Sequence, residues 1–305
     1  MYDIVIVGSG PAGLTAALYA RRAEKTVLVI EKNGFGGQIT HSPKVENYPG
    51  MTSVSGSEIG EQFLTQAMEQ GAEIELDTVT AIKGEPGNFT VVCEGAEYFA
   101  KSVIIATGSR HRTLGLEGEE RYTGEGISYC AVCDGAFYKG KTVAIIGGGN
   151  TALQEAILLS DGCEKVYVIQ NLADFTGEKN LASRLYTRDN IEVMFSTVVT
   201  GIIEDGEFRG IKIKKTETGE ESELALGGMF VAIGQVPENK PFENVTTLNS
   251  YGYIEAGEDC LPKGAPEGIF VAGDCRTKAI RQVTTATADG SVAALAACRF
   301  VDSLK

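Results

Sequence analysis

The sequence has no tryptophan, few prolines and histidines (8 and 2), and no long hydrophobic run. Its purely apolar runs, such as residues 4–7 and 143–146, fall far short of the roughly 18 residues that a membrane-spanning helix requires. We therefore expect no membrane span. The first residues include an acid, Asp3, and lead directly into a strand pattern, unlike a secretory signal peptide. The expected location is the cytoplasm.

Positive charge is also scarce. The 27 lysines and arginines are outnumbered by 41 aspartates and glutamates, which gives a net charge of −14. Because such a chain repels polyanions, neither nucleic acid nor an anionic membrane is expected as the main partner. The two histidines, His41 and His111, and the isolated cysteines other than Cys130 and Cys133 do not form a zinc motif, so no metal site is expected.

Glycine, in contrast, is abundant, with 38 residues, and the glycine-rich turns mark an internal repeat. Each copy reads as a buried strand, a glycine turn, a helix, a second strand and a closing run that ends in glycine. The first copy has these elements at residues 2–7, 8–13, 14–22, 26–30 and 103–108, and the second at residues 142–146, 147–152, 153–160, 165–169 and 230–234.

The end of the chain is expected to return to the first copy. Residues 268–274 read as another buried strand, and residues 286–304 as an amphipathic helix. The predicted fold class is α/β, with two Rossmann-like dinucleotide-binding domains, the second inserted into the first. The expected domains are 1–116 with 246–305, which would bind the first dinucleotide, and 117–245, which is NAD(P)-like and carries the paired cysteines.

The first glycine turn has the context of a dinucleotide site. It follows a buried strand and opens a helix, and an acid stands eighteen residues after its last glycine. Glycines allow a pyrophosphate to approach the backbone amides, and the acid can accept a hydrogen bond from a ribose hydroxyl. The candidate residues are Gly8, Gly10, Pro11, Ala12, Gly13 and Glu31.

Four further segments suit a bulky flavin. Two glycine-containing loops would supply backbone and an amide near the ring, a Gly-Asp pair would bind the ribityl chain, and a helix start near Thr284 would place amide donors where a reduced flavin accumulates negative charge. The candidates in these segments are Gly37, Gln38, Asn47, Gly273, Asp274, Arg281, Gln282 and Val283, and the end of the closing run of the first copy adds Ala106, Thr107 and Gly108.

The paired cysteines Cys130 and Cys133 lie shortly before the second repeat. A zinc half-site and an inert pair of buried thiols are the competing interpretations. We favour a redox-active dithiol, because the close spacing allows an intramolecular disulfide. Asp134 adds a carboxyl group that could carry a proton when the disulfide opens.

Together these motifs resemble the low-molecular-weight flavin thioredoxin reductases over nearly the whole chain. The resemblance rests on Gly-x-Gly-Pro-Ala-Gly, Gly-Gly-Gln, Glu-Asn-Tyr-Pro-Gly, Cys-Ala-Val-Cys-Asp-Gly, Ala-Gly-Asp and Arg-Gln-Val, in that order. It implies FAD as cofactor, thioredoxin as partner and a homodimer. It also implies that Cys133 faces the flavin, that Cys130 attacks the thioredoxin disulfide, and that Asp134 is the acid/base.

The second repeat departs from the family. Gln170 stands where Glu31 stands in the first repeat, and residues 170–176 read Gln-Asn-Leu-Ala-Asp-Phe-Thr where NADPH-using members carry His-Arg-Arg-x-x-x-Arg. Three phosphate-binding arginines are missing, so NADPH is expected to bind poorly. The pattern is similar to the ferredoxin-dependent flavin thioredoxin reductases of anaerobes.

Ferredoxin is thus the expected electron donor. The alternatives are an NADH- or NADPH-dependent reductase, with Arg184 or Arg188 substituting for the missing arginines, and a flavin redox sensor without turnover. Because ferredoxins are usually acidic, docking requires local positive charge. The candidate clusters are Lys212, Lys214 and Lys215, and Arg276, Lys278 and Arg281.

Overall fold

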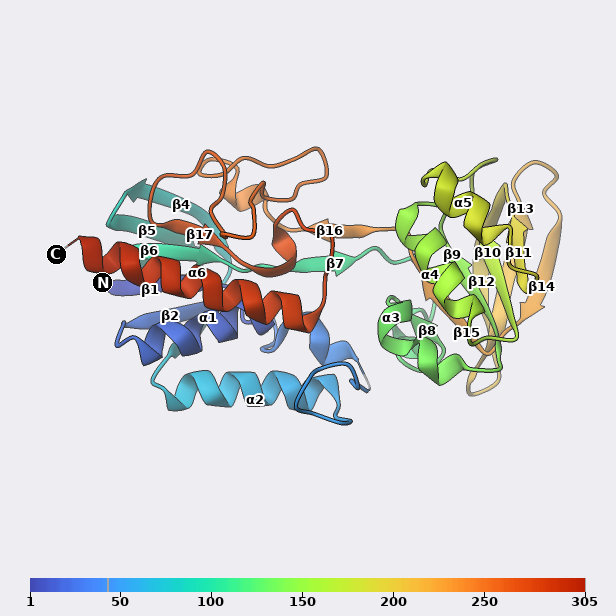
Figure 1. The fold of residues 1–305 in the computed structure, drawn as a ribbon, viewed down its shortest axis with the longest axis horizontal. Coiled ribbons are helices and arrows are strands. Elements are labelled where there is room, and N and C mark those ends of the chain that lie inside the picture. The colour runs from blue at the N-terminus through green and yellow to red at the C-terminus, as the bar shows by residue number, and fades with distance from the viewer. Residues whose placement is uncertain (43, 305) are drawn as a thin grey trace. The chain divides into compact units, whose positions relative to one another are not determined.

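The computed structural model describes residues 1–42 and 44–304. Pro43 and Lys305, the last residue of the expected first domain, lie outside the described residues. The chain divides into two compact units, one formed by Met1–Arg110 with Val236–Lys305 and the other by His111–Gln235 (Figure 1). The second unit is thus inserted into the first.

The first unit contains a seven-stranded sheet. Its strands are β1 (Tyr2–Val7), β2 (Val27–Glu31), β3 (Glu73–Leu76), β4 (Val79–Glu85), β5 (Asn88–Cys93), β6 (Glu97–Ile105) and β17 (Ile269–Val271), and its helices are α1 (Pro11–Arg22), α2 (Gly56–Glu69) and α6 (Val283–Ser303). Strands β3, β2, β1, β6 and β17 are mutually parallel, and β5 and β4 extend the sheet antiparallel.

Segments that are far apart in the sequence lie side by side in this unit. Strand β17, from the last part of the chain, pairs with β6, and α6 runs beside α1 (Figure 1). The core on this side of the sheet joins β1, β6, β17, α1 and α6, through side chains such as Ile4, Ile104, Leu14, Phe270 and Ala293. The C-terminal segment therefore completes the fold that the N-terminal segment begins.

The inserted unit contains two sheets. Its elements are β8 (Ile127–Ser128), α3 (Ala131–Asp134), β9 (Thr142–Ile146), α4 (Asn150–Ser160), β10 (Lys165–Ile169), α5 (Lys179–Leu185), β11 (Ile191–Met194), β12 (Thr197–Glu204), β13 (Phe208–Lys215), β14 (Glu221–Ala225) and β15 (Gly228–Val231). One sheet is parallel, in the order β11-β10-β9-β15-β8, and the other is an antiparallel meander of β12, β13 and β14. The repeat of strand, glycine turn, helix and strand is confirmed.

The two connections between the units pair with each other as a two-stranded sheet, β7 (Ser109–His111) and β16 (Gln235–Pro237). The units divide the chain after residues 110 and 235, whereas the expected boundaries followed residues 116 and 245. The buried carboxylate of Glu119 explains the first difference, because it accepts hydrogen bonds from the backbone N–H groups of residues 114, 115 and 116 and so joins this segment to the inserted unit.

Among residues 1–42 and 44–304, no helix is both long enough and apolar enough to cross a lipid bilayer.

Candidate functional site

The first glycine turn connects β1 to α1 and has almost no room for side chains. Gly8 has φ of +107°, and a Cβ there would overlap the carbonyl oxygen of Ala106 at the end of β6. A Cβ at Gly13 would overlap the carbonyl oxygen of Gly8. Pro11 is the first helical residue, where its missing N–H costs nothing. The turn thus lies directly on β6, at the carboxyl ends of the parallel strands.

Glu31 holds this turn from the end of β2. Its carboxylate accepts hydrogen bonds from the backbone N–H and the hydroxyl of Ser9, at 2.8 and 2.9 Å, and from the backbone N–H of Asn33, at 3.0 Å. Ser9 is fully buried and was not among the predicted site residues. The acid therefore orders the glycine turn itself, in addition to the ribose contact that the sequence predicts for it.

The second glycine loop contacts the first. A Cβ at Gly37, which has φ of +71°, would lie 2.7 Å from the Cα of Gly10, and the backbone N–H of Gly36 donates to the carbonyl oxygen of Ser9. Gln38 follows in the 3₁₀ helix Gly37–His41 with an exposed side chain. The two glycine loops of the first unit therefore lie against each other.

Polar residues extend the site from β6 towards the C-terminal segment. The hydroxyl of Thr107, next to Gly108, donates to the side-chain oxygen of Asn239 at 3.0 Å. Asn239 is only 1% exposed and donates to the carbonyl oxygens of Gly252 and Cys275. Sequence reasoning missed Asn239, because a single asparagine between two prolines, Pro237 and Pro241, is typical of an ordinary loop.

Gly273 and Asp274 lie just past β17. A Cβ at Gly273 would lie 2.8 Å from the Cβ of Ala12, so the pair meets the start of α1. Burial raises the pKa of Asp274 to about 6, against the opposing effect of Lys278 and Arg281. Its Oδ1 is buried and has no hydrogen-bond partner among the described residues. A buried acceptor of this kind suits a ligand hydroxyl.

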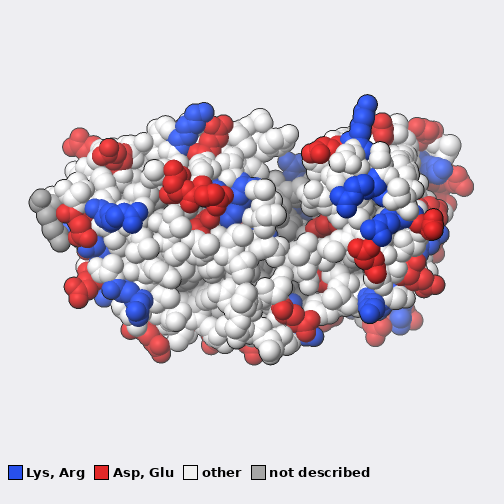
Figure 2. Space-filling view, in the orientation of Figure 1, with Lys and Arg blue, Asp and Glu red and all other residues white. Residues whose placement is uncertain are grey.

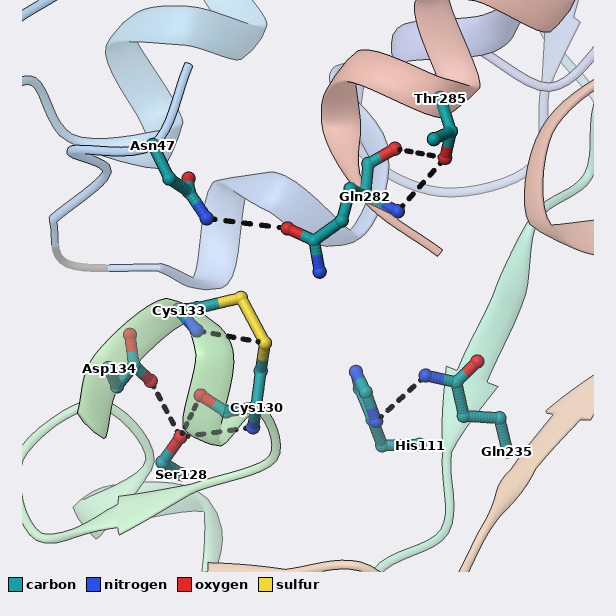
Figure 3. Close-up of a disulfide and its surroundings, with 9 residues drawn as sticks. All are labelled: Asn47, His111, Ser128, Cys130, Cys133, Asp134, Gln235, Gln282 and Thr285. Carbon is teal, nitrogen blue, oxygen red and sulfur yellow. Dashed lines mark hydrogen bonds between the residues drawn. A yellow bond between two sulfur atoms is a disulfide. The ribbon is translucent and has the colours of Figure 1, made fainter. Parts of the chain in front are cut away.

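Arg281, Gln282 and Val283 form the start of α6. Val283 is the first helical residue, and the side-chain oxygen of Gln282 accepts a hydrogen bond from Asn47 at 3.3 Å (Figure 3). The guanidinium of Arg281 lies 4.4 Å from the ring centroid of Tyr253, and its Nε is buried without a partner among the described residues. The structure brings Asn47 and Gln282 together from segments far apart in the sequence.

The residues fit a flavin dinucleotide. The first unit brings together two glycine loops, an acid at the end of the second strand and a free helix start. It also holds two buried polar atoms that lack partners, on Asp274 and Arg281. Together these groups can take a pyrophosphate, a ribose and a polyhydroxyl chain.

One expectation about this region is wrong. Arg276 and Lys278 were considered as exposed docking residues, but their side chains are 1% and 4% exposed. Both bind the buried carboxylate of Asp289 on α6, with closest distances of 2.9 Å. Without Asp289 the buried Lys278 would lose its carboxylate partner and Arg276 would keep only Glu258, so these residues form a buried ionic cluster of the first unit rather than a docking surface.

The paired cysteines form a disulfide in the inserted unit (Figure 3). Cys130 is the residue before α3, and Cys133 lies within that single helical turn, with a Cα–Cα distance of 5.3 Å. The backbone N–H of Cys133 donates to the Sγ of Cys130 at 3.2 Å. Both cysteines are partly exposed, so a partner can reach the bond.

Asp134 is coupled to the disulfide through Ser128. The Ser128 hydroxyl donates to Asp134 Oδ2 at 2.6 Å and accepts from the backbone N–H of Cys130 at 3.1 Å (Figure 3). Burial raises the pKa of Asp134, and the Ser128 hydrogen bond opposes that shift. A carboxyl group in this setting can hold and release a proton beside the sulfurs.

The second glycine turn is covered by the chain itself. Gln170 is 4% exposed, packs against Gly148 and donates to the carbonyl oxygen of Asp174. The backbone N–H groups of Thr176 and Gly177 both donate to the carbonyl oxygen of Gly148. No lysine or arginine stands between residues 166 and 178. Arg188, one of the two arginines considered as substitutes for the missing phosphate-binding arginines, is paired with Asp161 at 2.8 Å.

The other basic cluster considered for docking, Lys212, Lys214 and Lys215, lies on β13. Lys212 and Lys214 face glutamates of the neighbouring strand β14, at 4.0 Å from Glu223 and 3.2 Å from Glu221. These pairs balance the charge of this sheet surface.

Comparison with known proteins gives one family. The model described as pyridine nucleotide-disulphide oxidoreductase matches residues 2–290. The chain is 40% identical over 308 residues to "Thioredoxin reductase" of Bacillus subtilis (strain 168), covering 100% of this chain and 96% of that protein. It is also 40% identical over 305 residues to "Thioredoxin reductase" of Treponema pallidum (strain Nichols), covering 100% and 98%.

Solved structures agree. The thioredoxin reductase from Streptococcus pyogenes MGAS5005 superposes with a TM-score of 0.94 at 36% identity, covering 99% of both chains. The thioredoxin reductase from Giardia duodenalis superposes with a TM-score of 0.92 at 32% identity, again covering 99% of both. The predicted fold class, with two dinucleotide-binding domains of α/β type, is confirmed.

Proposed function

The chain belongs to the pyridine nucleotide-disulphide oxidoreductase family, and on that premise we propose that a ferredoxin supplies its electrons. It is a thioredoxin-disulfide reductase and depends on FAD. When bound, FAD accepts electrons singly or in pairs and supplies two of them to a disulfide. The proposal concerns the donor, the roles of individual residues and the assembly.

The first unit holds FAD in this proposal. The turn Gly8–Gly13 and the N-terminus of α1 bind the pyrophosphate, and Glu31 accepts from a ribose hydroxyl. Asp274 accepts from the ribityl chain through its unpartnered Oδ1. The N-terminus of α6, at Gln282 and Val283, directs its amides at developing negative charge.

The cysteine pair carries the electrons to thioredoxin. Two electrons and two protons convert the Cys130–Cys133 disulfide into two thiols. Cys130, as thiolate, then attacks the thioredoxin disulfide, and Cys133 closes the enzyme disulfide again as thioredoxin leaves with both electrons. Asp134 protonates the departing thiolate. Cys133 is the sulfur that faces FAD.

The strand end at Gln170 is the observation that carries the ferredoxin proposal. A 2′-phosphate requires cations, and residues 166–178 offer none. Gln170 is instead buried against the glycine turn, which binds the backbone of residues 176 and 177. Because a hydrogen bond to a charged group contributes roughly 1.5–3 kcal/mol, losing several of them weakens NADPH binding by orders of magnitude.

The donor is tested by anaerobic stopped-flow mixing of the oxidised holoenzyme with reduced ferredoxin, NADPH or NADH, followed by flavin absorbance. We expect rapid bleaching with reduced ferredoxin and no bleaching by micromolar NADPH. The variant Asn171→Arg/Leu172→Arg/Thr176→Arg restores the missing cations, and we expect it to bleach with NADPH but to respond to NADH as the wild type does. Rapid bleaching of the wild-type enzyme by NADPH or NADH would contradict the proposal.

We further propose that the enzyme is a homodimer in the cytoplasm. A shallow groove between α1, α2 and α6 is lined by uncharged side chains, including Leu18, Tyr19, Phe63, Thr287 and Ser291. Figure 2 shows few charged residues over this part of the first unit. An uncharged surface with exposed aromatic and aliphatic groups suits a subunit contact.

A further inference from the structure

Asp289 is a buried carboxylate of the first unit to which the proposed function gives no role. It lies in the second turn of α6 and is only 4% exposed. Its Oδ1 accepts a hydrogen bond from Arg276, and its Oδ2 accepts from Arg276, from Lys278 and from the backbone N–H of Gly273, each at 2.9 Å. Four hydrogen bonds from one loop therefore converge on a single side chain.

These donors flank Asp274 in the sequence. Gly273 precedes it, and Arg276 follows two residues later, directly after the 3₁₀ turn Gly273–Cys275. Gly273 has φ of +82° and lies against Ala12 at the start of α1. The backbone on both sides of Asp274 is thus bound to the same carboxylate.

Lys278 extends this connection to the start of α6. Its Nζ donates to Asp289 and also to the carbonyl oxygen of Thr285, at 3.3 Å. The hydroxyl of Thr285 in turn accepts from the backbone N–H of Gln282, the residue before the helix. Asp289 therefore joins the turn that carries Asp274 to the first turn of α6.

The charge of Asp289 makes these contacts strong. Burial by itself would raise the pKa of Asp289, but the hydrogen bonds from Arg276 and Lys278 outweigh burial and hold that pKa below its ordinary value. The group is therefore a carboxylate at neutral pH. Charge-assisted hydrogen bonds are stronger than neutral ones, and a guanidinium that binds both oxygens also fixes direction.

Asp274 lacks such support at one of its own oxygens. Its Oδ1 is buried and has no hydrogen-bond partner within the described part of the chain. The position of this oxygen is set by the backbone on either side of Asp274, which is the backbone that Asp289 holds.

We propose that Asp289 is a positioning residue for FAD, which holds the turn around Asp274 so that the unpartnered oxygen meets the ribityl chain. This inference rests on the proposed contact between Asp274 and the ribityl chain. A site that is fixed before binding loses less conformational freedom when its ligand arrives. Asp289 thus acts on FAD affinity through the turn.

The test compares the dissociation constants of the full-length chain for FAD and for ADP. ADP carries the diphosphate and the adenosine ribose but no ribityl chain, so its binding depends on the first glycine turn and Glu31. In Asp289→Asn we expect the dissociation constant for FAD to rise about tenfold and that for ADP to change by less than about twofold.

Flavin fluorescence measures FAD binding, and titration calorimetry of the chain freed of FAD measures ADP binding. A general loss of stability would weaken the binding of both ligands. Equal losses for FAD and ADP, or an unchanged affinity for FAD, would therefore overturn the proposal.

Glu258→Gln is the matched control, because it makes the same change from acid to amide at another partner of Arg276. The carboxylate of Glu258 binds that guanidinium at 3.0 Å, but its side chain is 87% exposed. Both dissociation constants should stay within about twofold of the wild type. A rise in the FAD constant as large as that of Asp289→Asn would show that the pairing of Arg276, and not the held turn, controls FAD binding.

A double-mutant cycle tests whether Asp289 acts through Asp274. The combined variant Asp274→Asn/Asp289→Asn should lose clearly less FAD affinity than the product of the two single losses. A loss equal to that product would overturn the positioning role alone. If Asp274→Asn binds FAD as tightly as the wild type, the proposed ribityl contact is itself wrong, and this inference is wrong with it.

A further variant keeps the test decisive if Asp289→Asn does not fold. That change leaves Lys278 buried without its carboxylate partner, which destabilises the first unit. Asp289→Asn/Lys278→Met removes this cation, and Lys278→Met alone is its reference. Relative to the reference we expect weaker binding of FAD and unchanged binding of ADP, whereas equal losses for both ligands would overturn the proposal.

Discussion

At the scale of single residues, three acids of the first unit differ in their hydrogen-bond and ion-pair partners. Glu31, Asp289 and Asp274 all lie in the first unit, yet Glu31 accepts backbone and hydroxyl hydrogen bonds, and Asp289 binds two cations. Only Asp274 has a buried oxygen left over among these three. The sequence predicts Glu31 and Asp274 through their motifs, but a lone aspartate inside an apolar helix gives no sign that it holds Arg276 and Lys278.

Asp274 gives a prediction on the pH dependence of the FAD-free protein. Its pKa in the folded state, about 6, exceeds the ordinary value of 3.8, so its contribution to stability is present below about pH 4 and is lost as the pH rises to 6. We expect Asp274→Asn to raise the free energy of unfolding at pH 7 by roughly 2–3 kcal/mol, with little change at pH 4.

Urea denaturation of the apoprotein at several pH values measures this effect. The exposed acid Glu267 provides the control, because Glu267→Gln should change stability little at any pH. A difference between Asp274→Asn and wild type that does not vary with pH would show that burial is not the cause. The same variant should bind FAD more weakly, since it loses an acceptor for the ribityl chain.

At the scale of elements, helices begin earlier than the sequence pattern indicates. The expected helices started at Leu14 and Leu153, but α1 begins at Pro11 and α4 at Asn150. The glycine turns themselves enter the helices, which places free N–H groups at the turn. Apolar periodicity cannot show this, because the first turn of each helix carries small and polar residues.

The contact between α1 and α6 provides the second prediction. Gly290 of α6 faces the backbone of α1, and a Cβ there would overlap the carbonyl oxygen of Ala12. Backbone cannot move aside as a flexible side chain can, so Gly290→Ala must push the helices apart. We expect a loss of about 1–3 kcal/mol in the free energy of unfolding and weaker retention of FAD.

Thermal unfolding followed by circular dichroism, with FAD release followed by fluorescence, measures both effects. Gly34→Ala is the matched control in the same unit, because no heavy atom lies within 4 Å of a Cβ there. Equal melting temperatures for Gly290→Ala and Gly34→Ala would contradict the packing argument.

At the scale of the whole molecule, the repeat predicts the insertion, but the junctions depend on contacts distant in sequence. The expected boundary follows residue 116, yet Glu119 binds residues 115 and 116 to the inserted unit. Asn239 similarly joins its segment to the first unit through Cys275. A pattern of residue types does not reveal which backbone groups a buried carboxylate or amide will bind.

Because the two junction strands pair with each other, we expect each unit to fold when it is expressed as a separate protein. The ends of His111–Gln235 are held together, because the N–H of Arg112 donates to the carbonyl oxygen of Gly234 and the side chains of His111 and Gln235 lie 3.4 Å apart. We expect this segment, expressed alone, to fold with its disulfide and without colour. Residues 1–110 joined to 236–305 by a short glycine linker should bind FAD and be yellow.

Circular dichroism, visible spectra and thiol titration of the two proteins test this expectation. Flavin retained by the isolated inserted segment would contradict the assignment of FAD to the first unit. A disordered inserted segment would show that the junction strands do not suffice to hold its ends.

The return of β17 and α6 to the N-terminal sheet also sets the order of events during biosynthesis. The inserted segment leaves the ribosome complete while the surrounding Rossmann layer still lacks a strand and the helix that covers α1. The inserted unit can therefore fold early, but with FAD bound as proposed we expect the nascent chain to retain a flavin only after α6 (Val283–Ser303) has been synthesised and has packed on α1. On the proposed assignment of FAD to the first unit, we expect a chain truncated before that point to be released as a colourless protein.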